Sequence, residues 1–420
     1  MIVVRPRRLP AGLACAAILA AGWWGEAVAL EGDRIRPSVG LVYSYTDNIY
    51  YLDDRQSGAG LLKNGQRGDQ TIGLRAGLDL DHYYSRQVFS LRSSLTNNRN
   101  QTYDQLDYTA YNLRGVWNWV SGERWDGDAG IEKTQVASTV YDFSVAQRAL
   151  RNLRTQDSYF ASGMLRMAAD WKLRGAVRYN DIANSQSRFQ TQNLEEWVLE
   201  GGSRRYSKAN DDFLGVNFRY ADGRYPNRLV VSGSVIDNAY RQYTAEAVID
   251  YRYSGLTRVS GNVGFTNRQY AQFAQRNFSG LTGRLSLVYD WSSKTQLTGE
   301  VFREIGAWED VTNNYVLTQG LRAVLQQSLT DKLALQVSYS LRDRSFLGDR
   351  DVTVANLPTR RDRLQSYAVG ATWQPSRNIS FNTSLSYDTR AANDAWAAVG
   401  FGPFNDFSVT TLSASGQLTF

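Results

Sequence analysis

The last ten residues of the chain, TLSASGQLTF, alternate strictly between two kinds of side chain. Leu412, Leu418 and the terminal Phe420 fall on one side of this pattern, and Ser413 and Gln417 fall on the other. A period of two places the two sets on opposite faces of a β-strand. In a strand that crosses an outer membrane, the apolar set faces lipid and the polar set faces a watery interior. An aromatic C-terminus is also the usual signal for the outer-membrane assembly machinery, and we expect Phe420 to serve as that signal.

The first 29 residues have the organisation of a secretory signal peptide. Arginines at positions 5, 7 and 8 precede a largely apolar stretch, and Ala27-Val28-Ala29 offers the small-x-small pattern of a signal-peptidase site. The apolar stretch is shorter than the roughly 20 residues that a membrane-spanning helix needs. We expect cleavage after Ala29, which would remove Cys15, the one cysteine of the chain. The mature chain would then have neither disulfides nor thiolate chemistry.

Alternation begins at Ile35 and recurs to the end of the chain, interrupted by short connections and by longer ones. This asymmetry is typical of the periplasmic turns and external loops of outer-membrane barrels. The chain is therefore predicted to be all-β, with one transmembrane antiparallel up-and-down β-barrel over residues 30–420 and 18 strands, or alternatively 16. The short turns are expected at residues 85–86, 121–123, 170, 207–211, 254–257, 292–294, 330–331 and 374–377. A barrel of this size is wide enough to enclose an aqueous channel.

Aromatic residues gather where the predicted strands approach the short turns. Rings at the level of the lipid headgroups form girdles around outer-membrane barrels. The sequence therefore predicts a periplasmic girdle that includes Trp117, Trp119, Trp171, Tyr253, Trp291 and Trp373.

Charged residues occur repeatedly on the polar face of the strands. They cannot face lipid, because a basic residue at the bilayer midplane costs about 2 to 4 kcal/mol. We therefore expect them to line the pore, and the strongest candidates are Arg75, Arg92, Arg114, Arg166, Arg174, Arg178, Arg219, Arg284, Arg322, Glu200 and Glu300. Two interpretations stay open: a hydrated interior of mutually paired charges, or an arginine-biased path for an anionic or polar polymer.

The sequence offers no arrangement for catalysis, for a cofactor or for nucleic-acid binding. His82 is the single histidine, and its position near a periplasmic turn does not suit an outer-membrane hydrolase. A calcium site among Asp47, Asp53 and Asp54 in the first long loop would be nonspecific, and we expect no bound metal. The 47 basic residues are spread along the chain and are nearly matched by 41 acidic ones, which argues against a nucleic-acid partner.

Two segments of the first half, residues 84–130 and 148–181, resemble EpsL-type outer-membrane proteins of the β-barrel porin 2 group, and the opening run RPSVGLVYSYTDNIYYLDD is similar as well. Such proteins are encoded with exopolysaccharide synthesis genes in the exosortase B and PEP-CTERM sorting context of Gram-negative bacteria. The resemblance implies passage of a newly made exopolysaccharide across the outer membrane, fed by periplasmic export components. The family has no catalytic motif, so no residue role carries over by position.

Two other roles remain open. The barrel could be a non-conducting outer-membrane platform for an exopolysaccharide or surface-protein assembly machine, with its long loops as the working part. It could also be a general diffusion porin, which would need a loop folded inward as a constriction. The candidates for such a loop are residues 223–239 and 344–362.

Overall fold

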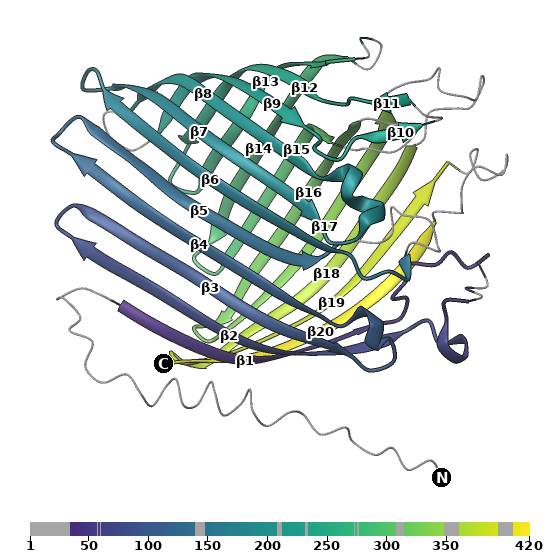
Figure 1. Ribbon diagram of the computed structural model, residues 1–420. Helices are drawn as coiled ribbons and strands as arrows, with labels where there is room; N and C mark the ends of the chain where they lie inside the picture. The colour runs from purple at the N-terminus through teal and green to yellow at the C-terminus, as the bar shows by residue number, and fades with distance from the viewer. Residues whose placement is uncertain are drawn as a thin grey trace.

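The computed structural model of the chain describes residues 34–56, 58, 60–138, 148–207, 212–231, 234–272, 274, 277–307, 315–347, 361–393 and 406–420. Within them, the backbone forms one 18-stranded antiparallel sheet that closes on itself (Figure 1). The predicted signal peptide, residues 1–29, lies outside the described residues. No helix of the described part is long and apolar enough to cross a membrane.

The barrel strands follow one another around the wall in chain order. They are β1 (Arg34–Thr46), β2 (Asp69–Tyr84), β3 (Gln87–Asn100), β4 (Tyr108–Ser121), β5 (Trp125–Ala137), β6 (Leu153–Arg166), β7 (Trp171–Asn184), β8 (Leu194–Tyr206), β9 (Phe213–Arg224), β12 (Tyr240–Arg252), β13 (Thr257–Tyr270), β14 (Phe278–Ser292), β15 (Thr295–Ala307), β16 (Tyr315–Thr330), β17 (Leu333–Leu347), β18 (Arg361–Ser376), β19 (Ile379–Ala392) and β20 (Phe407–Thr419). The prediction of 18 strands is confirmed.

The first and last strands close the barrel. β1 pairs with β20 in an antiparallel register that runs from Ser38 opposite Thr419 to Thr46 opposite Thr411. The backbone N–H of Phe420 extends this pairing by donating to the carbonyl of Pro37, at 2.9 Å. Closure leaves no unpaired strand edge, which is the condition for a sheet to stand in lipid.

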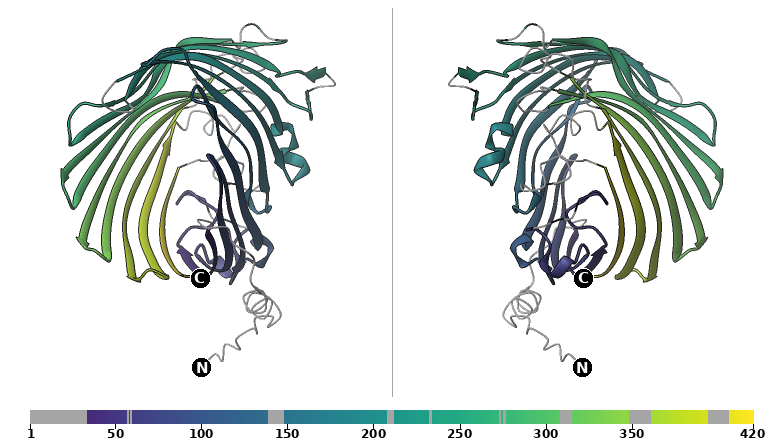
Figure 2. Two further views of the ribbon diagram at one scale, coloured as in Figure 1. Left: turned by 90° about the vertical axis from the view of Figure 1, so that its left-hand side faces the viewer. Right: turned by 90° about the vertical axis from the view of Figure 1, so that its right-hand side faces the viewer.

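Short connections join the strands at one end of the barrel and long ones join them at the other (Figures 1 and 2). The predicted short turns match the structure except in their bounds. The largest difference is at predicted turn 374–377, because β18 continues to Ser376 and only residues 377–378 connect it to β19. The pairing of these strands shifts register between Trp373 and Ser376, and such an irregularity breaks the alternation that the prediction used.

Among the described residues, the long connections contain three short 3₁₀ helices and one hairpin. They are η1 (Lys63–Gly65), η2 (Asp104–Leu106), η3 (Ser187–Gln192) and the pair β10 (Leu229–Val231) with β11 (Ser234–Ile236). The hairpin falls within residues 223–239, one of the two loops expected to constrict the pore. The other, 344–362, lies largely outside the described residues between positions 348 and 360.

Alternation sets the two faces of the wall. In β17, Leu335, Val337 and Tyr339 face outward, and the residues between them face the interior. Many outward residues have no protein cover: Phe218 is 64% exposed and Leu281 is 62% exposed. A continuous apolar surface of this kind is stable only against lipid.

One glycine of the wall is required by the backbone. Gly261 has φ of 142°, and a methyl group at this position would lie 2.0 Å from the carbonyl oxygen of Arg284 on the neighbouring strand. Gly261→Ala should therefore lower the free energy of unfolding by about 1 to 3 kcal/mol, measured by urea unfolding of the lipid-embedded barrel. Gly299→Ala is the matched control, since a methyl group there would meet no atom within 4 Å. Equal stabilities of the two variants would contradict this interpretation.

Candidate functional site

The ladder registers place all of the predicted pore-lining residues on the inner face of the wall. Arg92 stands opposite Arg114, Arg114 opposite Glu132, and Glu200 opposite Arg219. Arg75, Arg166, Arg174, Arg178, Arg284, Arg322 and Glu300 share this face by the same alternation. Whether they govern passage through the barrel stays a proposal.

Much of this inner charge is paired across strands. Arg174 forms an ion pair with Glu200 at 2.6 Å. Glu132 forms ion pairs with both Arg114, at 2.7 Å, and Arg178, at 3.5 Å. Arg92 contacts Asp81 at 2.6 Å. Such cross-strand pairs hold the wall together and neutralise one another.

Other predicted residues lack such a partner. Among the described residues, no acidic side chain forms an ion pair with Arg75, Arg166, Arg219 or Arg322. The sequence placed these arginines on the inner face but could not tell which would be paired, since an arginine side chain reaches acids on either neighbouring strand.

The inner wall of β14–β18 has a cavity of about 520 Å³ with a different charge arrangement. Arg284 occupies one side of it, and its guanidinium is held by Glu300 and by Glu304 at 2.8 Å. The same guanidinium lies 4.8 Å from the centre of the Phe302 ring. Arg322 and Arg342 line the rest of the cavity, so one side is neutralised and the other keeps its positive charge.

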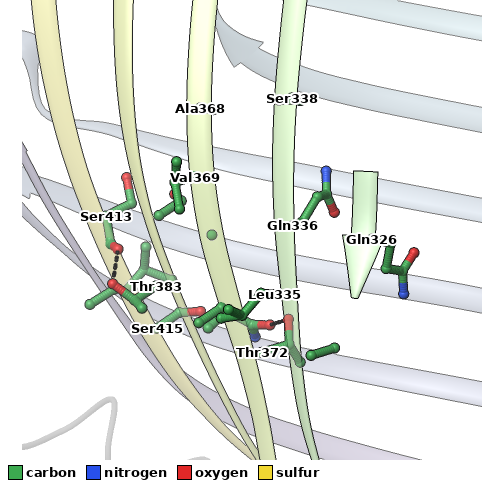
Figure 3. A pocket seen from close by; sticks show the side chains of 17 residues that line it. Gln326, Leu335, Gln336, Ser338, Ala368, Val369, Thr372, Thr383, Ser413 and Ser415 are labelled. Atoms are coloured by element: carbon green, nitrogen blue, oxygen red, sulfur yellow. Dashed lines mark hydrogen bonds between the residues drawn. The ribbon is translucent and has the colours of Figure 1, made fainter. Parts of the chain in front are cut away.

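A second cavity, of about 310 Å³, lies further along the same wall (Figure 3). Its inward-facing lining is uncharged and consists of Val42 together with small or amide side chains: Gln326, Ala334, Gln336, Ser338, Ala368, Gly370, Thr372, Asn382, Ser384, Ser413 and Ser415. Ser338 lines both cavities, which therefore meet on β17. Together they form a polar groove, defined here by the lining residues of the two cavities.

The first long loop, residues 47–68, packs near the inner side of the barrel mouth. The Tyr51 ring meets the inward-facing Phe407 ring edge-on, with centroids 5.0 Å apart. The Asn48 side-chain amide donates to the carbonyl of Ser408 at 3.1 Å. The fully buried Arg148 donates to the carbonyls of Tyr50 and Tyr51, at 3.2 and 2.5 Å. The sequence predicted an external loop here but not its packing against the inner side of the mouth, because its anchors come from strands and loops distant in the sequence.

The core of this loop is apolar, and two of its acidic residues contact arginines. Tyr50, Leu52 and Tyr103 form a buried cluster, and burial raises the pKa of the Tyr50 hydroxyl to about 12. The hydrogen bond from Arg55 holds the pKa of Asp53 below its ordinary value of 3.8. Asp54 lies 3.5 Å from Arg67. Asp53 and Asp54, two of the three carboxylates weighed as calcium ligands, therefore have arginine neighbours, and Asp47 accepts from the backbone N–H of Thr410 at 2.8 Å. The described residues contain no group of three or more metal-ligating side chains.

A second buried cluster lies near the mouth on the opposite part of the wall. It comprises Leu194, Tyr225, Tyr240, Tyr270, Phe278 and Tyr315. The Arg268 guanidinium stacks on the Tyr240 ring at 4.1 Å and donates twice to the Gln242 side chain, at 2.9 and 2.7 Å. Because Tyr225 follows β9 directly, this cluster anchors the start of the connection that carries the β10–β11 hairpin.

The outer face has aromatic residues near both ends of the strands. The predicted girdle residues Trp117, Trp119, Trp171, Trp291 and Trp373 face outward beside short turns, and Tyr253 lies in a short turn with 78% exposure. A further outward row lies closer to the long loops and was missed by the sequence analysis, with Tyr159, Tyr179 and Trp197 side by side on β6–β8. The alternation of the sequence was sufficient to predict that these three residues face outward. His82 is also outward, near the turn after β2.

Comparisons with known proteins add little beyond the fold. No family model matches the chain, and no curated protein matches it. Among solved structures, OpdK from Pseudomonas aeruginosa with vanillate has 10% identity and a TM-score of 0.48, covering 93% of this chain and 100% of that one. The siderophore receptor PirA from Acinetobacter baumannii has 11% identity and a TM-score of 0.46, covering 91% and 80%. Likenesses this distant carry no argument about a substrate.

The physical features of the barrel settle its class and its location. Closure satisfies the backbone polar groups of the wall within the sheet, and the outer face presents apolar side chains between aromatic rows. The inner face carries paired charges and polar cavities. The chain is therefore an outer-membrane β-barrel protein with a polar interior.

Proposed function

We propose that the barrel is an outer-membrane channel that exports a newly synthesised exopolysaccharide. The observation that carries this proposal is the polar groove on the inner wall of β14–β20 and β1, where the second cavity presents small hydroxyl and amide side chains that suit a hydrated glycan. Hydroxyl and amide groups offer many weak hydrogen bonds, so a polymer can be held and released in steps. The resemblance of the sequence to EpsL-type proteins supports the same role.

Other chains would have to deliver the polymer. The described residues of this protein are almost entirely barrel wall and loops, with no periplasmic domain among them. The proposal therefore includes periplasmic export components as partners, together with outer-membrane lipid around the barrel and the assembly machinery that inserts it.

The packed loop at the mouth favours one alternative, the non-conducting platform. Residues 47–68 are fixed near the inner side of the rim by Arg148 and Phe407, which would suit a barrel that presents loops to a partner. Planar-bilayer recordings with neutral oligosaccharides separate the two roles. Large openings that the oligosaccharides block would support export, and a folded barrel that stays silent after removal of residues 49–66 would support the platform. Free passage of small solutes without block by oligosaccharides would support a general diffusion porin.

A tryptophan at position 338 should obstruct the groove. Ser338 faces inward where the two cavities meet, so Ser338→Trp should reduce channel current and secreted polymer several-fold. The matched control is Val337→Trp, since Val337 faces lipid and is 47% exposed. Both variants should fold, which the heat-dependent gel mobility of the barrel would show. Normal secretion by a folded Ser338→Trp barrel would mean that the polymer does not follow this wall.

A further inference from the structure

The larger cavity holds two arginines that its acidic residues do not neutralise. Both carboxylates of the cavity, Glu300 and Glu304, bind Arg284. Within the described part of the chain, neither Arg322 nor Arg342 forms an ion pair. Three guanidinium groups and two carboxylates therefore leave the cavity with an excess of one positive charge.

The register shows why the two arginines are left over. Glu300 stands directly opposite Arg322 in the ladder, yet its carboxylate is bound to Arg284 on the other neighbouring strand. Arg342 stands between Gly320 and Leu364, neither of which has a polar side chain. Asp362, a buried acid on the neighbouring strand β18, is bound by Arg344 and Arg390. Glu300, Glu304 and Asp362 are therefore all bound to other arginines.

The surroundings fit a sugar that carries an acidic group. Thr318, Ser340 and Ser366 supply hydroxyl groups to the same cavity, and Phe302 supplies a ring. Gly320, opposite Phe302, leaves the space that the ring occupies, since a methyl group there would lie 2.9 Å from the ring edge. Arginine suits carboxylate recognition, because its planar fork can donate two parallel hydrogen bonds.

From this arrangement we propose that Arg322 and Arg342 form a binding subsite for the carboxylate of a sugar acid, so that the exported polymer contains uronate units. This inference rests on the proposed export function for its physiological meaning, but the subsite itself can be measured without export. The uncharged second cavity of the groove would contact the sugar hydroxyls, and the subsite would retain the polymer briefly at each acidic unit.

The test compares an oligogalacturonate with a neutral malto-oligosaccharide of the same length as blockers of the single-channel current. The wild-type barrel should be blocked at lower concentration by the oligogalacturonate. In Arg322→Gln/Arg342→Gln, the affinity for the acidic blocker should fall by about tenfold or more, because charge-assisted hydrogen bonds are lost. Block by the neutral oligomer should not change. Arg303→Gln, on the outer face of β15, is the matched control and should behave like the wild type.

A binding measurement on the detergent-solubilised barrel separates failure of this inference from failure of the export proposal. Calorimetric binding of trigalacturonate that the double glutamine variant loses would support the subsite even if the channel stays silent. Conductance with equal block by both oligomers and no trigalacturonate binding would overturn the subsite and leave export standing. If the glutamine variant does not fold, Arg322→Lys/Arg342→Lys replaces it. The lysine variant keeps the positive charges but lacks the planar guanidinium groups that donate two parallel hydrogen bonds. Unchanged trigalacturonate affinity in this variant would therefore also overturn a carboxylate-specific subsite.

Discussion

Asp362→Asn should lower the free energy of unfolding by about 3 to 5 kcal/mol, because it breaks a buried ionic network. The Asp362 side chain is fully buried and accepts from Arg344 at 2.7 and 2.9 Å. It also accepts from Arg390, whose side chain is equally buried. Removing the negative charge of Asp362 would leave both guanidinium groups without this carboxylate in a site with almost no access to water.

Urea unfolding of the lipid-embedded barrel, followed by tryptophan fluorescence, would measure this loss. Asp343→Asn is the control, since Asp343 pairs with Arg363 at 2.7 Å but both side chains are well exposed. Surface pairs contribute little, so this second change should stay within about 1 kcal/mol of the wild type. A similar small effect for both variants would mean that the Asp362 network is hydrated and contributes no more than a surface pair.

Deletion of Phe420 should reduce the amount of barrel in the outer membrane several-fold while leaving the stability of the refolded protein nearly unchanged. The Phe420 ring is 56% exposed on the outer side, so it buries little surface in the folded barrel. Its backbone adds one hydrogen bond, to Pro37, to a closing ladder that already spans nine residue pairs. A large effect in cells and a small one in vitro would together assign the residue to assembly.

Fractionated membranes and immunoblotting would give the cellular amount, and urea unfolding of protein refolded from inclusion bodies would give the stability. Phe381→Ala is a suitable control, because Phe381 is an outward aromatic residue of β19, 44% exposed, and is not terminal. A normal cellular amount of the deletion variant would remove Phe420 as the assembly signal. If the deletion instead lowered the stability of the refolded protein as strongly as it lowered the cellular amount, the role of Phe420 would be structural.

The strands and the faces of their residues could be predicted from the sequence because both depend on local periodicity. Val337 and Ser338 occupy opposite faces for no reason other than their adjacent positions in a strand. The inward placement of Arg284 and Glu300 follows from the same alternation, together with the cost of charge in lipid. Strand ends were less accurate where a bulge occurs, as at Trp373 to Ser376.

The pairing of charges could not be predicted in this way. Arg322 and Arg284 have the same phase and similar neighbours, and both lie beside Glu300 in space, yet the acid binds Arg284. Which arginine binds Glu300 depends on how far the side chains extend across the two neighbouring strand pairs. It also depends on Phe302, whose ring packs against the Arg284 guanidinium. The packing of residues 47–68 against Phe407 is also long-range, because the contact joins a loop near the start of the chain to the last strand, β20.

The sequence by itself determined that this protein is an all-β barrel, which side chains face lipid and which face the interior, and that the interior is charged. The two faces of each strand alternate every two residues, and a charged side chain or an unpaired backbone group in lipid has a high free-energy cost. Only the tertiary structure decided which charges neutralise one another, where the polar groove runs and where residues 47–68 pack at the mouth. Closure of the barrel brings β1 beside β20 and loops beside distant strands, and these contacts depend on three-dimensional distance, which local alternation does not encode.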